Sequence, residues 1–262
     1  MNLFIHDRPA YVYTGTRALV DGQRTVMFIH GAANDHSVWA LQSRYFAYHG
    51  WNVLAVDLPG HGKSSEPLLS TIEAMAGWCN AALTQARTGP TAVVGHSMGS
   101  LIALELAALH PQKVSTLVLV GTAFPMKVSD ALLGTAKADD HAALDMITVW
   151  SHSSAGQVGG NRSPGQWIMG SGMRLLERNA KGLYNDFTAC NEYGAANESA
   201  AKVGCQTLVI SGNRDLMTPA KAARGLAGKL PNAQVRLIEG AGHDLMAEQP
   251  DQLLDELIGF LG

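Results

Sequence analysis

The feature that most constrains this chain is a serine between two glycines, Gly95-His-Ser-Met-Gly99, where one apolar run ends and another begins. The β-branched run 91–95 predicts a strand, and residues 97–110 predict a helix. A serine at such a strand-to-helix turn is the pattern of a nucleophile elbow. Side chains at either glycine would collide with the strand and helix that meet there. Ser97 is therefore the candidate nucleophile, with the positive end of a helix dipole beside it.

Strand and helix patterns alternate on both sides of this turn. Two short strands at 3–5 and 11–14 predict an antiparallel hairpin at a sheet edge. The alternation predicts right-handed crossovers and a mostly parallel central sheet covered by helices on both faces, which is the α/β class. The further strands are expected at 25–30, 51–57, 114–120, 206–211 and 234–238, and the further helices at 37–49, 72–87, 219–230 and 250–261.

Residues 124–203 interrupt this alternation. They contain no clear strand and show short helical patterns at 131–136, 142–150 and 167–178. We expect a helical cap here, inserted into a core made of residues 1–123 and 204–262. Large and flexible side chains in the insertion, which include Trp150, Trp167 and Met173, could line an apolar pocket over Ser97. For any single one of them, filling a small core of the cap itself is the favoured alternative.

Composition narrows the class of protein and of partner. A chain of 262 residues with 47% hydrophobic residues can bury one full α/β core, and a net charge of -3 provides no basic surface for nucleic acid. Three widely spaced cysteines, with no metal-ligand spacing, indicate free thiols in a reducing compartment and no metal site. The N-terminus resembles no signal peptide and no apolar stretch could span a membrane. We expect a soluble, cytoplasmic protein, whose oligomeric state the sequence does not define.

A serine hydroxyl needs a base with a pKa near 7 before it can attack a carbonyl at neutral pH, and imidazole fits. His243 lies in a small-residue loop directly after a predicted strand, where it can reach across the carboxyl edge of the sheet. Asp215 follows another strand at the same edge and can fix the tautomer of that base. Asp215 could instead cap the helix that begins near Pro219. Asp244 is a rival acid, but an adjacent residue rarely folds back onto its neighbour's ring.

Other histidines compete for the role of base. His96 lies within the elbow, where packing or a loop hydrogen bond is expected. His61 lies in the glycine-rich turn 59–62, where we expect a structural role. His141 and His152 lie in the cap and could touch a substrate, although surface exposure is expected of both.

The sequence resembles proteins of the α/β-hydrolase fold over nearly its whole length. The resemblance is carried by His30-Gly31, by 57–64 (DLPGHGKS), by the elbow, by 212–215 (GNRD) and by Gly242-His243, in that order. It implies a catalytic triad of Ser97, Asp215 and His243. It also implies an oxyanion hole made by the backbone N–H groups of Met98 and Ala32, and no metal or organic cofactor.

These residues predict a serine hydrolase, of carboxylesterase type, that cleaves a small-molecule carboxylic ester of modest size through an acyl-enzyme. Perhydrolases and lactonases share the same core and remain alternatives. Hydrolases of C–C bonds share it too, but they typically carry Trp after the catalytic His, where this chain has Asp244. Haloalkane dehalogenases and epoxide hydrolases use Asp where this chain has Ser97. A ligand-binding protein of this fold that does not catalyse is the alternative from another class.

Overall fold

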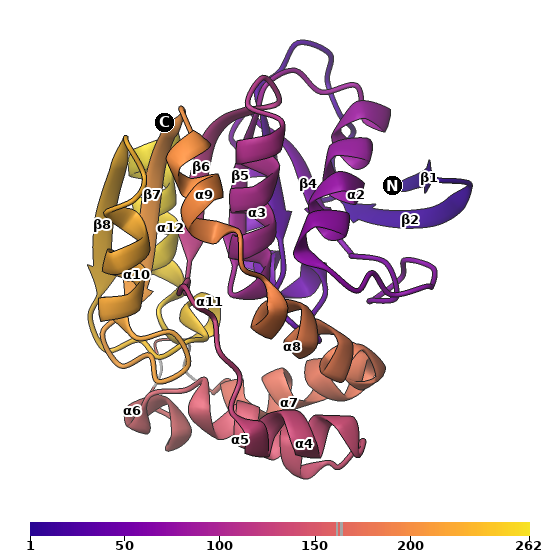
Figure 1. The fold of residues 1–262 in the computed structure, drawn as a ribbon. Helices are drawn as coiled ribbons and strands as arrows, with labels where there is room; N and C mark the ends of the chain where they lie inside the picture. Colours follow the sequence, from indigo (N-terminus) through magenta and orange to yellow (C-terminus); the bar gives the residue numbers. More distant parts are fainter. Residues whose placement is uncertain (161, 163–164) are drawn as a thin grey trace.

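The computed structural model describes residues 1–160, 162 and 165–262. Within them, eight strands form one sheet in the order β1-β2-β4-β3-β5-β6-β7-β8 (Figure 1). β1 pairs antiparallel with β2 and β2 antiparallel with β4, while the other strands are parallel. The strands are β1 Asn2–Ile5, β2 Arg8–Tyr13, β3 Thr25–Ile29, β4 Asn52–Val56, β5 Thr91–His96, β6 Val114–Val120, β7 Gln206–Gly212 and β8 Ala233–Ile238.

Helices cover both faces of the sheet, as the alternation predicts (Figure 1). The central strands are apolar on both sides: Val26 and Phe28 of β3 belong to one core, and Met27 and Ile29 to the other. α1 and α12 pack on the first face, and α2, α3 and α10 on the second. The bounds are α1 Ala40–Tyr48, preceded by the 3-10 turn His36–Trp39, α2 Ile72–Gln85, α3 Met98–Leu109, α10 Ala220–Ala227, α11 Leu245–Glu248 and α12 Pro250–Leu261.

The chain between β6 and β7 forms an inserted helical region, most of which lies at the lower end of Figure 1. Helices were predicted at 131–136, 142–150 and 167–178, and α4, α5 and α7 lie there. The short helices α6, α8 and α9 were not predicted. The bounds are α4 Asp130–Lys137, α5 Ala142–Trp150, α6 Ser154–Gln157, α7 Ile168–Asn179, α8 Leu183–Glu192 and α9 Ala196–Lys202.

The inserted region divides between two cores. Leu132, Leu144, Leu176 and Phe187 form a small separate core with Ala33 of the loop after β3. α9 packs instead against α3, and its alanines join the core of the sheet. The last helix of the insertion therefore covers the sheet rather than the site.

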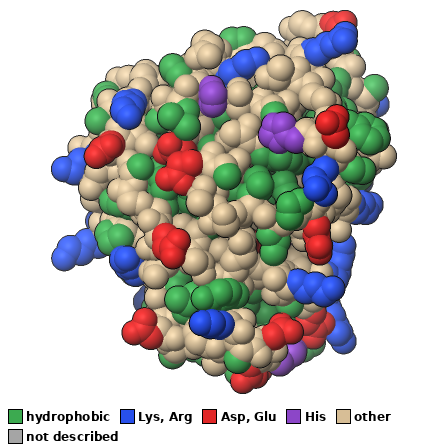
Figure 2. All heavy atoms as spheres, turned by 45° about the vertical axis from the view of Figure 1, so that its right-hand side comes forward, with side chains coloured by type: hydrophobic (Ala, Val, Ile, Leu, Met, Phe, Trp, Pro, Cys, Tyr) green, Lys and Arg blue, Asp and Glu red, His purple; other side chains and the backbone are tan. Residues whose placement is uncertain are grey.

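No helix in the described part of the chain is long and apolar enough to cross a membrane. On the face shown in Figure 2, acidic and basic side chains are interspersed, and neither sign forms a continuous patch.

Candidate active site

Ser97 stands at the turn between β5 and α3. Its backbone has φ 53° and ψ -121°, a conformation that non-glycine residues rarely adopt. The flanking glycines permit this turn. A Cβ at Gly95 would lie 2.1 Å from the carbonyl oxygen of Gly99, and a Cβ at Gly99 would lie 2.4 Å from that of Ile29. The elbow is therefore packed backbone against backbone.

His243 and Asp215 form a buried pair at the same edge of the sheet. Nδ1 of His243 lies 2.8 Å from Oδ2 of Asp215, and both residues are at most 6% exposed. Because a carboxylate only accepts, the proton of the neutral ring is on Nδ1. Nε2 of His243 is therefore the nitrogen that can take up a proton.

Asp215 is held by its own loop as well. Its Oδ1 accepts the backbone N–H groups of Met217 and Thr218, at 2.8 and 2.7 Å. The hydroxyl of Thr218 donates to Oδ2 at 2.6 Å. The two roles considered for Asp215, loop capping and orientation of the histidine, are thus both present in one carboxylate.

Burial and charge act in opposite directions on this pair. Burial lowers the pKa of His243, but the adjacent Asp215 carboxylate acts in the opposite direction and outweighs burial. The net pKa is therefore raised above the ordinary value of 6.5. Burial raises the pKa of Asp215, yet His243 and the hydrogen bonds from Thr218 leave it below its ordinary value. The arrangement stabilises an imidazolium beside a carboxylate.

The loop after β3 passes directly over the elbow. A Cβ at Gly31 would lie 3.2 Å from Cβ of Ser97. His30 anchors the loop, because its Nδ1 donates to the carbonyl of Gly31 at 2.8 Å and its Nε2 accepts the N–H of Leu58 at 3.1 Å. Burial lowers the pKa of His30 to about 4, so the ring is neutral. Within the described residues, the N–H groups of Ala32 and Met98 have no protein acceptor.

Two cavities meet at Ser97 and His243. The smaller has a volume of about 80 Å³ and is walled by Ile147, His152 and Leu176 among others. The larger has a volume of about 180 Å³, with Met126, Leu132 and Trp150 in its wall.

Of the three cap residues predicted to line the pocket, Trp150 does so and the other two do not. Trp167 is 72% exposed, and with Met173 it borders a separate hollow on the outer side of the inserted region. The ring of Trp167 lies over Gly170, where a Cβ would come within 2.3 Å of it. The expectation that Trp167 and Met173 line the pocket over Ser97 is therefore corrected. Because Gly170 has no side chain, the ring of Trp167 can pack on the first turn of α7.

The two competing histidines of the core have structural roles. Nε2 of His96 donates to the backbone oxygen of His243 at 2.9 Å, and burial lowers the pKa of His96 to about 3. His61 is buried, and its Nε2 lies 2.9 Å from Oδ2 of Asp186 in α8. Burial lowers the pKa of His61, but the Asp186 carboxylate overcomes this and the net pKa is raised.

Two acids near the site escaped prediction, and one histidine was expected in the wrong environment. Asp186 accepts the N–H of Ala33 at 2.9 Å. Glu248 accepts the N–H of Ser153 at 2.9 Å and that of Gly242 at 2.5 Å. His152, expected to be exposed, is 2% exposed. No local sequence pattern marks Asp186 or Glu248. Ala33 and Ser153, whose N–H groups donate to these two carboxylates, lie far away in the sequence, and Gly242 is the backbone donor that lies close by.

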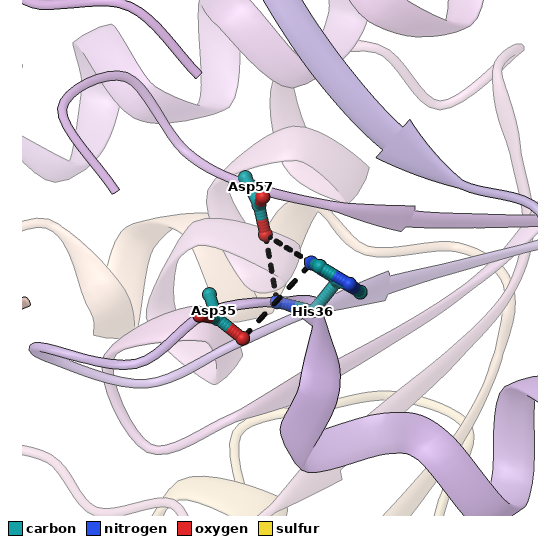
Figure 3. A group of neighbouring side chains, drawn as sticks. All are labelled: Asp35, His36 and Asp57. Carbon is teal, nitrogen blue, oxygen red and sulfur yellow. Dashed lines mark hydrogen bonds and ion pairs between the residues drawn. The ribbon is translucent and has the colours of Figure 1, made fainter. Parts of the chain in front are cut away.

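Asp35, His36 and Asp57 bring possible metal-ligand atoms within 4.8 Å of one another (Figure 3). These atoms already carry hydrogen bonds. Oδ1 of Asp57 accepts from the backbone N–H and from Nδ1 of His36, at 2.8 and 2.7 Å. Oδ2 of Asp57 accepts the N–H of Lys63, and Oδ1 of Asp35 accepts that of Ser37. The cluster ties the loops after β3 and β4 together.

Comparison with known proteins agrees with this geometry. Residues 26–256 match the sequence profile described as "Alpha/beta hydrolase family". The chain is 30% identical over 255 residues to the dihydrolipoyllysine-residue acetyltransferase component of the acetoin cleaving system of Cupriavidus necator, a match that covers 92% of this chain but only 64% of that protein. It is also 30% identical over 245 residues to the pimeloyl-[acyl-carrier protein] methyl ester esterase of Neisseria meningitidis serogroup A, which covers 87% of this chain and 73% of that one.

Among solved structures, the enol-lactonase from Burkholderia xenovorans LB400 superposes with a TM-score of 0.88 at 20% identity, over 100% of this chain and 99% of the other. At this identity the likeness shows a common fold. The profile match over most of the chain, together with the elbow and the Asp–His pair, establishes that the chain belongs to the Alpha/beta hydrolase family.

Proposed function

We propose that this protein is a serine esterase that cleaves a small carboxylic ester through a covalent acyl-enzyme. The observation that carries the proposal is the 2.8 Å contact between Nδ1 of His243 and Oδ2 of Asp215, in a loop that borders the same cavities as Ser97. A positioned base and a serine on a strained elbow are what nucleophilic acyl transfer requires.

The first half of the reaction follows from the protonation states. Nε2 of His243 takes the hydroxyl proton of Ser97 as Oγ bonds to the ester carbonyl carbon. The tetrahedral intermediate then collapses, the bond from carbon to the alcohol oxygen breaks, and the imidazolium returns the proton to the leaving alcohol. Asp215 remains ionised and stabilises the imidazolium.

In the second half, water replaces the alcohol. Nε2 accepts a proton from water as its oxygen attacks the acyl carbon, and the proton passes to Oγ of Ser97 when the acid leaves. Both halves place negative charge on the carbonyl oxygen. In this proposal the N–H groups of Ala32 and Met98 stabilise that charge, and loss of one such donor typically costs about 3 to 4 kcal/mol of transition-state stabilisation.

The cavities support a substrate of modest size. Their volumes of about 80 and 180 Å³ are below the roughly 300 to 1,000 Å³ of sites for drug-sized ligands. In this proposal residues 124–203 act as the cap that shapes both cavities, and the apolar part of the ester lies against Trp150. The curated relative from Neisseria is named as an ester hydrolase, which favours the same reaction class.

Substitution of the nucleophile tests the proposal. Ser97→Ala should lower kcat for p-nitrophenyl butanoate by several orders of magnitude and abolish labelling by a serine-directed phosphonate. Ser115→Ala, which changes an exposed serine of β6, should retain both. Residual activity of the Ser97 variant above about 1% of the parent would contradict the assignment, since triad losses are much larger.

A further inference from the structure

A polar pair lies beside the triad and takes no part in it. Nε2 of His152 and Oδ2 of Asp244 are 3.6 Å apart, a separation longer than a hydrogen bond. Both residues line the smaller cavity, together with Ser97 and His243. The side chain of His152 is 1% exposed and that of Asp244 is 22% exposed.

The tautomer of His152 is fixed by its position after α5. Nδ1 lies 2.8 Å from the carbonyl oxygen of Thr148, and a carbonyl can only accept, so the proton of the neutral ring is on Nδ1. In this neutral ring Nε2 is an acceptor. Within the described residues, no hydrogen-bond partner reaches Nε2. Two acceptors therefore face each other, and a buried acceptor without a donor is unfavourable.

The pair is not needed to hold its two loops together. The backbone oxygen of Ser151 accepts the N–H groups of His243 and Asp244, at 2.7 and 2.9 Å. Glu248 adds hydrogen bonds to the backbone N–H and the hydroxyl of Ser153, at 2.9 and 2.6 Å. These contacts fix the positions of the two acceptors without using their side chains.

The wall beside the pair leaves room for a ligand group. It is formed by Gly172 of α7, where a Cβ would lie 3.9 Å from Cε1 of His152 and 4.0 Å from Oδ2 of Asp244. Both distances are ordinary van der Waals separations. A methyl-sized group at this point would therefore touch the His152 ring and the Asp244 carboxylate without a clash.

We propose that His152 and Asp244 form a subsite that accepts a hydroxyl or amide N–H group carried by the substrate beside the ester bond attacked by Ser97. This inference rests on the proposed esterase function and names its substrate class. A neutral donor suits the subsite, because a substrate anion would be repelled by Asp244 and a cation would face the imidazolium that forms on His243. Burial also raises the pKa of the Asp244 carboxyl, against the opposing effect of His152, His243 and the Ala247 N–H.

Matched substrates test the inference. In the acyl series, p-nitrophenyl 3-hydroxybutanoate is compared with the butanoate and the 3-methoxybutanoate, which has no donor. In the alcohol series, 2-hydroxyethyl butanoate is compared with propyl butanoate. The parent enzyme should prefer the hydroxylated ester by at least about fivefold in kcat/KM in one series, which also identifies the side of the ester that enters the subsite. The methoxy ester should not share this preference.

Variants then connect the preference to the pair. His152→Phe and Asp244→Asn should each bring the ratio of kcat/KM between hydroxylated and plain ester close to one. Gly172→Ser should do the same, because its hydroxyl would supply the missing donor from the protein side. His141→Phe is the matched control, since His141 belongs to an exposed histidine–aspartate pair with Asp145, and the ratio should be unchanged.

The outcomes separate the two proposals. If the plain esters are hydrolysed and Ser97 is labelled, but the ratio is near one in the parent or persists in the folded variants, the subsite is overturned and the esterase stands. If no ester is hydrolysed and Ser97 is not labelled, the esterase proposal is overturned, and the subsite proposal that rests on it is overturned as well. Gly172→Ser keeps the test decisive if both other variants fail to fold.

Discussion

Asp186 in α8 accepts a hydrogen bond from the backbone N–H of Ala33, in the loop after β3, at 2.9 Å. The same oxygen lies 2.9 Å from Nε2 of His61. One carboxylate oxygen from the inserted region thus holds the loop that carries Ala32 and a second loop of the core, and its side chain is fully buried.

Removing this charge should destabilise the protein in a pH-dependent manner. Asp186→Asn should lower the free energy of unfolding by about 1 to 3 kcal/mol, because an amide oxygen replaces the ion between two buried donors. The pKa of His61 is raised in the folded protein. The stabilisation linked to that raised pKa is therefore fully present below the unfolded pKa of about 6.5 and is lost as pH rises through the folded value.

Urea unfolding of parent and variant at pH 6 and pH 9 measures this difference, and titration of other groups cancels in the comparison. The difference should be larger at pH 6. Asp145→Asn, at an exposed partner of His141, is the control and should have little effect. An equal difference at both pH values would show that His61 carries no charge in this pair.

The pH dependence of catalysis should report the Asp215–His243 pair. Because the net pKa of His243 is raised above 6.5 and only the neutral ring can act as base, kcat/KM should rise with pH through an apparent pKa above that value. Asp215→Asn should lower kcat by about 1,000-fold or more and move the limb to lower pH. A flat profile from pH 5 to 8 in the parent would exclude His243 as the base in the limiting step.

The glycines of the elbow should tolerate no side chain. Gly95→Ala places a methyl group 2.1 Å from the oxygen of Gly99, so the free energy of unfolding should fall by about 3 kcal/mol or more. Gly77→Ala in α2 is the matched control. Its Cβ would meet nothing within 4 Å, and the higher helix propensity of alanine should stabilise the protein by about 0.5 to 1 kcal/mol. Thermal unfolding followed by circular dichroism measures both, and similar melting temperatures would refute the packing described for the elbow.

Two tryptophans of the inserted region should behave differently. Trp150 lines the larger cavity with Ser97, so Trp150→Ala should shift the preferred acyl length in a panel of p-nitrophenyl esters, each methylene of fit being worth about 1 to 3 kcal/mol. Trp167→Ala changes a ring that is 72% exposed and should leave the profile unaltered. The cavity assignment fails if both variants, or neither, change the profile.

The sequence predicted the core well because its signals are local. The turn at Ser97 needs small residues within two positions of the serine, and the buried strands are short apolar runs bounded by turns. The loops of Asp215 and His243 follow such strands directly. Parallel pairing then brings all three residues to one edge of the sheet.

The inserted region was predicted less well, because its structure depends on contacts between distant residues. Asp186 lies 153 residues from Ala33, and no spacing rule connects them. His152 is buried because Thr148 binds its ring and the loop of Asp244 covers it. Trp167 was expected over Ser97 because it is a large side chain in the inserted segment, whereas the space above Gly170 decides where the ring lies.

Glu248 makes the evolution of two distant segments interdependent. Its carboxylate holds both Gly242, next to His243, and Ser153 of the inserted region. A homologue that loses the acid at 248 leaves buried N–H groups in both segments without an acceptor, so a compensating change must arise in one of them. Across the family, the residues at 153 and 248 should therefore covary, although the insertion as a whole is free to diverge from the core.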